Sequence, residues 1–174
     1  SVRVTVDQAG RIEEALLNSE LDVALIEGVV RHPHLIRQPF SSYDMAAFCA
    51  PSHPLATRSP LSLDDLLTAE LLLREPGSAI RDAFDSALLL RDRCAEPAWT
   101  SVNSPALAAA AREGLGVAVL PACLTEADVA AGRLVRLEVE GLTLGVGEPV
   151  VDQLPDALVG KAGGGVPLGV VLQD

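Results

Sequence analysis

The chain has 174 residues, of which 49% are hydrophobic and only 3% aromatic, so its core must be built from leucine, valine, isoleucine and alanine. Thirteen basic residues against 24 acidic ones give a net charge of -11, which argues against a surface for DNA, RNA or anionic lipid. No apolar run reaches the ~18 residues of a membrane helix. No secretory leader opens the chain, so we expect a cytoplasmic protein that is not held by a membrane. We expect the three cysteines, Cys49, Cys94 and Cys123, to be buried reduced thiols.

The first fifty residues alternate predicted strands with a predicted helix. Valines alternate with polar residues over 2–6, which is the period of a strand, and 12–18 has the spacing of a helix. Residues 23–26 are an apolar strand, so the three segments predict one right-handed βαβ unit. Two more strands are predicted over 35–40 and 45–50.

After a proline-rich break at 51–54 the alternation continues. Residues 62–65 and 125–128 have the pattern of capping boxes at helix starts. Helices are predicted after Ser78 and over 106–113, the second with Ser104 as its cap and Pro105 as its first residue. Strands are predicted over 71–73, 97–102, 117–120 and 135–139. Strands and helices in this order predict an α/β fold with mostly parallel sheets.

The stretch from Thr100 to Pro121 carries the clearest sign of a ligand site. A strand leads through the polar turn at Asn103 and Ser104 into a helix, and the apolar strand 117–120 follows. The first N–H groups of a helix point outward and attract a small anion. In open α/β sheets, ligands bind at the carboxyl ends of the strands, so we expect a ligand at this turn.

Six segments in order resemble the effector-binding (regulatory) domain of LysR-type transcriptional regulators. They are 18–28, 50–56, 61–66, 74–78, 114–121 and 132–135. The resemblance implies two Rossmann-like α/β lobes of the type 2 periplasmic-binding-protein-like fold, with an interlobe cleft. Lobe I would comprise 1–50 and 141–174, and lobe II 51–140, with crossovers near Ala50 and Glu140.

The resemblance also implies the site. A small, anionic effector would lie between the lobes, with no cofactor, no metal and no enzymatic activity. The residues carried over are Gly77, Ser78, Ala79, Val102, Asn103, Ser104 and Pro121 from lobe II, and Glu27 and Gly28 from lobe I. The implied assembly is a homodimer or tetramer. The motifs near Glu27 and Gly77 lean toward a branch of the family associated with sulfur or carbon assimilation.

The chain departs from the family pattern in three places. The N-terminal helix-turn-helix is absent, so DNA would be bound only through a segment outside this chain. The first regulatory-domain strand is also absent, which would leave a gap in the sheet of lobe I. The tail after about Leu144 does not resemble the usual final strand and helix, and we predict that its stretch 166–172 fills part of the gap.

Several of these residues also have a simpler interpretation that involves no ligand. Ser78 and Ser104 are helix caps in either case, and Asn103 suits a turn. Glu27 fits a solvated carboxylate slightly better than a ligand contact, and Arg74 a surface or salt-bridged residue. The histidines of 32–34 lack further metal ligands, which favours a loop. Trp99 is expected in the core or between the lobes. A free-standing solute-binding protein of related fold is the alternative function.

Overall fold

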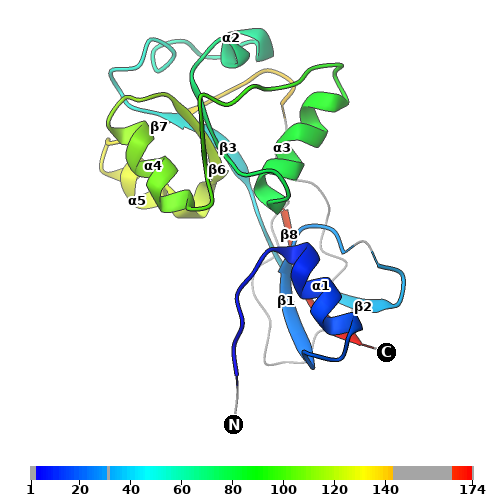
Figure 1. Cartoon of the computed structure of the whole chain (residues 1–174). Helices are drawn as coiled ribbons and strands as arrows, with labels where there is room; N and C mark the ends of the chain where they lie inside the picture. Colours follow the sequence, from blue (N-terminus) through cyan, green and yellow to red (C-terminus); the bar gives the residue numbers. More distant parts are fainter. Residues whose placement is uncertain (1–2, 31, 143–165, 174) are drawn as a thin grey trace.

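The computed structural model of the chain describes residues 3–30, 32–142 and 166–173, which form two lobes (Figure 1). Lobe I contains α1 (Ala9–Leu17), β1 (Val23–Glu27), β2 (Leu35–Tyr43) and β8 (Val166–Gln173). Lobe II contains β3 (Met45–Cys49), α2 (Leu63–Leu67), β4 (Leu71–Arg74), α3 (Ala79–Leu89), β5 (Trp99–Ser101), α4 (Ser104–Arg112), β6 (Val117–Pro121), the 3-10 helix η1 (Ala122–Leu124), α5 (Glu126–Ala130) and β7 (Val135–Leu137). The predicted two-lobed α/β architecture is therefore confirmed.

The two sheets have different strand directions. In lobe I the order is β1-β8-β2, and β8 runs antiparallel to both neighbours. In lobe II the order is β5-β4-β6-β3-β7; β4 is parallel to β5 and β6, whereas β3 is antiparallel to β6 and β7. The expectation of mostly parallel sheets is wrong, because the apolar pattern of a strand does not tell which way its neighbour runs.

The chain crosses between the lobes earlier than expected. Only Asp44 separates β2 in lobe I from β3 in lobe II, so the first crossover lies there and not near Ala50. All five residues of β3 are buried, because the strand lies between β6 and β7 and is covered on both faces. Val139 forms a β-bridge with Leu61, so the chain still belongs to lobe II at residue 139. The second crossover, expected near Glu140, is not seen in the described residues up to 139.

The predicted strand over residues 2–6 does not form in the described part of that segment. Residues 3–8 are irregular and exposed, with Val4 78% and Val6 91% accessible. No described strand pairs with them, so their apolar side chains have no covered face, and the predicted βαβ unit is wrong too. The prediction for the tail is confirmed, since β8 lies between β1 and β2 with Leu25 opposite Val170.

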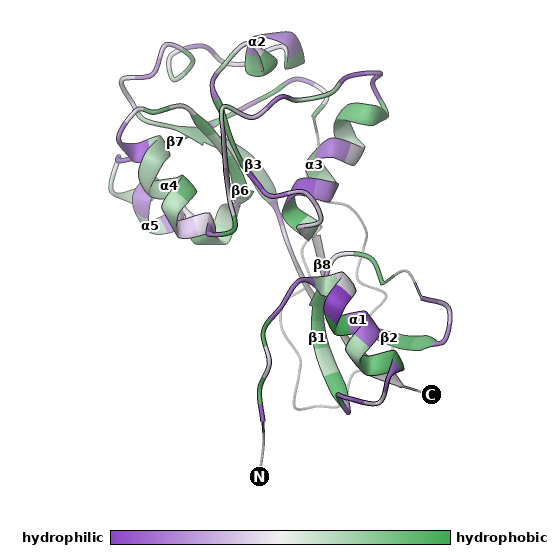
Figure 2. Cartoon of the chain, in the orientation of Figure 1, coloured by the Kyte–Doolittle hydropathy of each residue, from purple (hydrophilic) through white to green (hydrophobic). Residues whose placement is uncertain are grey.

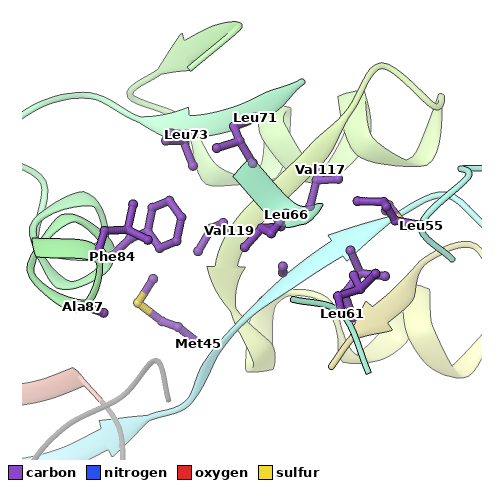
Figure 3. Close-up of a cluster of buried hydrophobic side chains, with 14 of the residues drawn as sticks. Met45, Leu55, Leu61, Leu66, Leu71, Leu73, Phe84, Ala87, Val117 and Val119 are labelled. Atoms are coloured by element: carbon purple, nitrogen blue, oxygen red, sulfur yellow. The ribbon is translucent and has the colours of Figure 1, made fainter. Parts of the chain in front are cut away.

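Lobe II holds the larger core, with one apolar cluster on each face of its sheet. On one face Phe84 of α3 packs with Leu71 and Leu73 of β4 and with Val117 and Val119 of β6 (Figure 3). On the other face Leu107 and Ala111 of α4 pack against the residues that alternate with these, among them Leu72 and Ala118. Residues 71–73 of β4 and all of β6 are therefore apolar, because both of their faces are covered.

Among the described residues, the sheet of lobe I is covered by a helix on one face only. Ile12 and Leu16 of α1 pack on Ala24 and Ile26 of β1. The alternate residues point away from this helix, and Leu25 is 73% exposed. Each of the helices α1 and α3 packs one side on its sheet, and each has both apolar and polar residues along its length (Figure 2).

The two predicted capping boxes have different outcomes. Ser62 and Asp65 form the reciprocal box at the start of α2, as predicted. At the start of α5 the predicted box is wrong, because the Thr125 hydroxyl donates to the carbonyl of Ala122. Asp128 instead accepts hydrogen bonds from Arg112 and Arg133, at 3.1 and 2.7 Å.

We predict that Asp128→Asn lowers the melting temperature and flattens its dependence on acid. The hydrogen bonds from Arg133 and then Arg112 outweigh the opposing effect of desolvation and hold the pKa of Asp128 below its usual range. Its stabilising effect is therefore present above the unfolded-state pKa of about 3.9 and is lost as the pH falls through the folded-state value. Scanning calorimetry at neutral pH should show the largest difference between the two proteins, and the difference should shrink as the pH is lowered into the acid range where Asp128 becomes protonated.

Asp22→Asn is the matched control, since Asp22 is exposed and has no ion pair with any residue that the structure describes. An Asp128→Asn protein with the same melting temperature as the wild type at neutral pH would contradict the role assigned to this cluster.

Two expectations about buried side chains need correction. Trp99 is 53% exposed on β5, an edge strand, and so belongs neither to the core nor to the lobe interface. Cys49 is buried, and burial raises the pKa of its thiol to about 11, but Cys94 and Cys123 are exposed. Among the described residues no helix is both long and apolar enough to cross a bilayer.

Candidate functional site

Two adjoining cavities lie where the lobes face each other. The first, of about 600 Å³, is lined by the end of β1, the start of α1, the loop after β4 and the start of α3. The second, also about 600 Å³, is lined by the ends of β2 and β6 and the start of α4. Glu27, Arg74 and Val102 border both cavities. The volumes are those of a site for a small molecule.

The structure places the predicted site residues along this cleft. Glu27, Gly77, Ser78, Ala79 and Val102 line the first cavity. Glu27, Val102, Asn103, Ser104 and Pro121 line the second. Gly28 lies at the contact between the lobes, with φ of +93°. A Cβ added there would lie 2.8 Å from the Cβ of Ala79, so glycine is what allows the lobes to approach this closely.

The start of α3 faces the first cavity without a cap. Ser78 occupies the N-cap position, but its side chain makes no capping hydrogen bond, contrary to the expectation. The residue is only 7% exposed, and its hydroxyl has no hydrogen bond to any residue that the structure describes. A buried hydroxyl and uncapped N–H groups at one helix end are donors for a negatively charged group.

The start of α4 is arranged differently from the prediction. Asn103 is the cap, and its Oδ1 accepts from the N–H of Ala106 at 3.1 Å. The helix therefore begins at Ser104, one residue earlier than expected, and Pro105 is its second residue instead of its first. The Ser104 hydroxyl oxygen accepts from Arg74 Nη1 at 2.9 Å instead of capping the helix.

Arg74 is held by two partners within lobe II. Its Nε and Nη2 donate to the two carboxylate oxygens of Glu75, at 2.8 and 3.1 Å, and both side chains are largely buried. Burial acts to raise the pKa of Glu75 and is the largest single effect, but the hydrogen bonds from Arg74, a backbone hydrogen bond and the charge of Arg74 together lower the pKa. The interpretation of Arg74 as a salt-bridged residue is confirmed.

Glu27 is tied to lobe I by a tyrosine. The Tyr43 hydroxyl donates to Glu27 Oε1, and the carboxylate is partly buried, so the interpretation as a solvated turn residue is wrong. Burial, and then the charge and hydrogen bond of Glu27, raise the pKa of Tyr43. Tyr43 is the last residue of β2, immediately before the crossover at Asp44, and its hydrogen bond connects this point of the chain to Glu27 at the end of β1.

Sequence reasoning missed several residues of the cleft. They are Asp7, Arg11, Leu25, Tyr43, Glu75, Cys123 and Leu124. Tyr43 had a usable signal, because it is the one tyrosine of the chain and lies between the strands predicted over 35–40 and 45–50. The histidine pair gave no metal site: the rings of His32 and His34 lie 5.4 Å apart, and no metal-binding group was found among the described residues.

Comparison with known proteins identifies the fold family. The model of the "LysR substrate binding domain" matches residues 1–148 of the chain. The chain belongs to the LysR substrate-binding domain family. Its relatives are transcriptional regulators and not enzymes, and the domain is the ligand-binding regulatory part of such proteins.

The curated LysR-type relatives are about twice as long as the matched region. An uncharacterized HTH-type transcriptional regulator of Escherichia coli, YeiE, is 33% identical over 138 residues, which cover 79% of this chain and 47% of the relative. The RuBisCO operon transcriptional regulator of Allochromatium vinosum is 26% identical over 80% of the chain and 46% of its own length. The chain thus spans about half the length of these relatives.

Solved LysR-type regulatory domains share the fold. The regulatory domain of Synechocystis CcmR, in complex with 2-PG, superposes with a TM-score of 0.74 at 19% identity, covering 99% of this chain and 74% of that one. The effector-binding domain of QuiR, in complex with shikimate, gives a TM-score of 0.71 at 15% identity, covering 97% and 69%. Both likenesses establish the two-lobed fold.

Proposed function

We propose that this domain senses a small metabolite in the cleft between its lobes and thereby controls a DNA-bound oligomer. The observation that carries the proposal is the start of α3, where uncapped N–H groups and a buried Ser78 hydroxyl, which bonds to no described residue, face a cavity of about 600 Å³. An anionic group of the metabolite would accept from these donors. The complexes of CcmR with 2-PG and of QuiR with shikimate support a ligand-binding role for this fold.

Control of the oligomer follows if the metabolite binds one arrangement of the lobes better than another. Differential affinity then shifts the population of lobe arrangements and biases the assembly. We propose a homodimer or tetramer acting in the cytoplasm, with DNA bound by a part of the protein outside these 174 residues. The net charge of -11 supports this division of labour, because DNA binding needs basic surface. The lean toward sulfur or carbon assimilation stays part of the proposal, and the RuBisCO operon regulator among the relatives supports it.

A thermal-shift screen with small carboxylates and sulfur oxyanions tests the site. A ligand at ~100 times its dissociation constant should stabilise the chain by about 2.7 kcal/mol. For a chain of this size that corresponds to a rise of roughly 5–11 °C in melting temperature. Ser78→Ala should abolish the rise, since it removes a donor at the anion site.

Ser62→Ala is the matched control for that variant. It removes a serine that caps α2 away from the cleft, so the basal melting temperature should fall, at about 1 kcal/mol of lost stability, while the ligand-induced rise stays. A rise that survives in Ser78→Ala would contradict the assigned site, and a screen without any response would contradict the sensing function.

A further inference from the structure

The first cavity holds more negative than positive charge. Five charged side chains line it: Asp7, Glu27 and Glu75 against Arg11 and Arg74. Three carboxylates minus two guanidinium groups leave one net negative charge. A simple anion therefore meets an acidic cavity, although the start of α3 offers it donors.

Both arginines are already paired with carboxylates. Arg74 donates to both carboxylate oxygens of Glu75 and to the hydroxyl of Ser104, so all three nitrogens of its guanidinium already form hydrogen bonds. Arg11 Nη1 lies 3.5 Å from Asp7 Oδ2. The Arg74 guanidinium is therefore not free to clamp an anion unless one of its bonds breaks, whereas the Arg11 side chain is 73% exposed and makes only this one long contact among the described residues.

The two helix starts that face the cavity differ in the side chains beside them. Asp7 lies at the start of α1, where its Oδ1 accepts from the N–H of Gln8 at 2.8 Å, so this end carries its own carboxylate. Neither helix has a side-chain cap, and α3 has Asp82 in its first turn, but the start of α3 adds the buried Ser78 hydroxyl, which has no hydrogen bond to any described residue. The start of α3 is therefore where we expect the anionic group of a ligand to bind.

Glu27 is the carboxylate of the cleft that has no ion pair with any residue that the structure describes. Among the described residues its side chain bonds to the Tyr43 hydroxyl alone, and it borders both cavities. A partly buried carboxylate gains most from a charged donor, because such hydrogen bonds are about twice as strong as neutral ones. The missing partner is a positively charged group.

We infer that the effector is a zwitterion of amino-acid type, with its carboxylate at the start of α3 and its ammonium group at Glu27. This inference rests on the proposed function and names the chemical class of its ligand. The ligand would bridge the lobes, since Glu27 belongs to lobe I and Ser78 to lobe II. A ligand that contacts both lobes favours the closed cleft, as sensing requires.

The test compares matched ligands on the 174-residue chain. The twenty L-amino acids are screened by thermal shift, and each hit is measured by calorimetry beside its 2-hydroxy acid and its des-amino acid. We expect the amino acid to bind about tenfold or more tightly than either analogue. Glu27→Gln should weaken the amino acid by a similar factor and leave the 2-hydroxy acid unchanged or tighter.

Two further variants keep the test decisive. Glu14→Gln removes the same charge from an exposed position of α1 and should leave all affinities unchanged. Tyr43→Phe removes the competing hydroxyl and should maintain or strengthen amino-acid binding, whether or not Glu27→Gln folds. A 2-hydroxy acid, a des-amino acid or sulfite that binds as tightly as any amino acid would overturn the inference and leave the proposed function standing. If no carboxylate, oxyanion or amino acid binds, both fail.

Discussion

Gly116→Ala is expected to destabilise lobe II by roughly 2–5 kcal/mol. Gly116 has φ of +154°, and a Cβ added to it would lie 2.1 Å from the carbonyl oxygen of Glu70. That oxygen cannot withdraw, because it accepts from the N–H of Val117 where β6 enters the sheet beside β4. The methyl group would push β6 away from β4 in the buried centre of the sheet. Scanning calorimetry should show a melting temperature lower by roughly 4–20 °C.

Gly114→Ala separates the clash from the backbone conformation. Gly114 has φ of +78°, but no atom lies within 4 Å of an added Cβ, so only the left-handed strain of roughly 1–2 kcal/mol is expected. Equal losses in the two variants would contradict the close approach of Gly116 to Glu70.

The strands and helices that could be predicted are those whose local pattern has one structural solution. Residues 117–120 contain no polar side chain, and β6 is buried on both faces. Ser62 and Asp65 have the spacing of a capping box, and they form one. These features depend on neighbours in sequence, so the sequence alone carries them.

The lobe to which a strand belongs depends on contacts distant in sequence. The pattern over 45–50 predicts a strand, but β3 enters lobe II because β6 and β7 flank it there. Residues 2–6 also have the period of a strand, but the described part of this segment forms none, because no described strand pairs with it. Periodicity reports what a segment would bury, and the rest of the chain decides whether a partner is present.

The candidate site shows the same division. The backbone positions of the cleft follow from motifs at strand ends, and the structure brings them together. The side-chain bonds do not follow, since Ser104 binds Arg74, 30 residues away, and Glu27 binds Tyr43, 16 residues away. The charges available to a ligand depend on these long-range bonds, which is why an anionic effector was the expectation from sequence and a zwitterion is the inference from structure.

Gly28→Ala is expected to abolish the effector response while the chain still folds. The new Cβ would lie 2.8 Å from the Cβ of Ala79, and ordinary carbon contacts are about 3.5–4 Å, so the lobes must separate by about 1 Å at this point. Gly28 directly follows Glu27, and Ala79 directly follows Ser78, so the separation would part the two predicted ligand contacts. In the thermal-shift assay the ligand-induced rise of roughly 5–11 °C should fall to nearly zero.

The double variant Gly28→Ala with Ala79→Gly distinguishes contact from backbone strain. It removes the clashing methyl group, and the next atom, the Cα of Ala79, lies at an ordinary 3.6 Å. The left-handed conformation of residue 28 lowers the basal stability by roughly 1–2 kcal/mol in the single and the double variant alike. We therefore expect the ligand response to return in the double variant and to persist in Ala79→Gly alone. If the ligand causes no rise in the melting temperature of the double variant, backbone strain at residue 28, and not the approach of the lobes, controls the site. If the rise returns, the closeness of Gly28 to Ala79 couples ligand binding to the arrangement of the lobes.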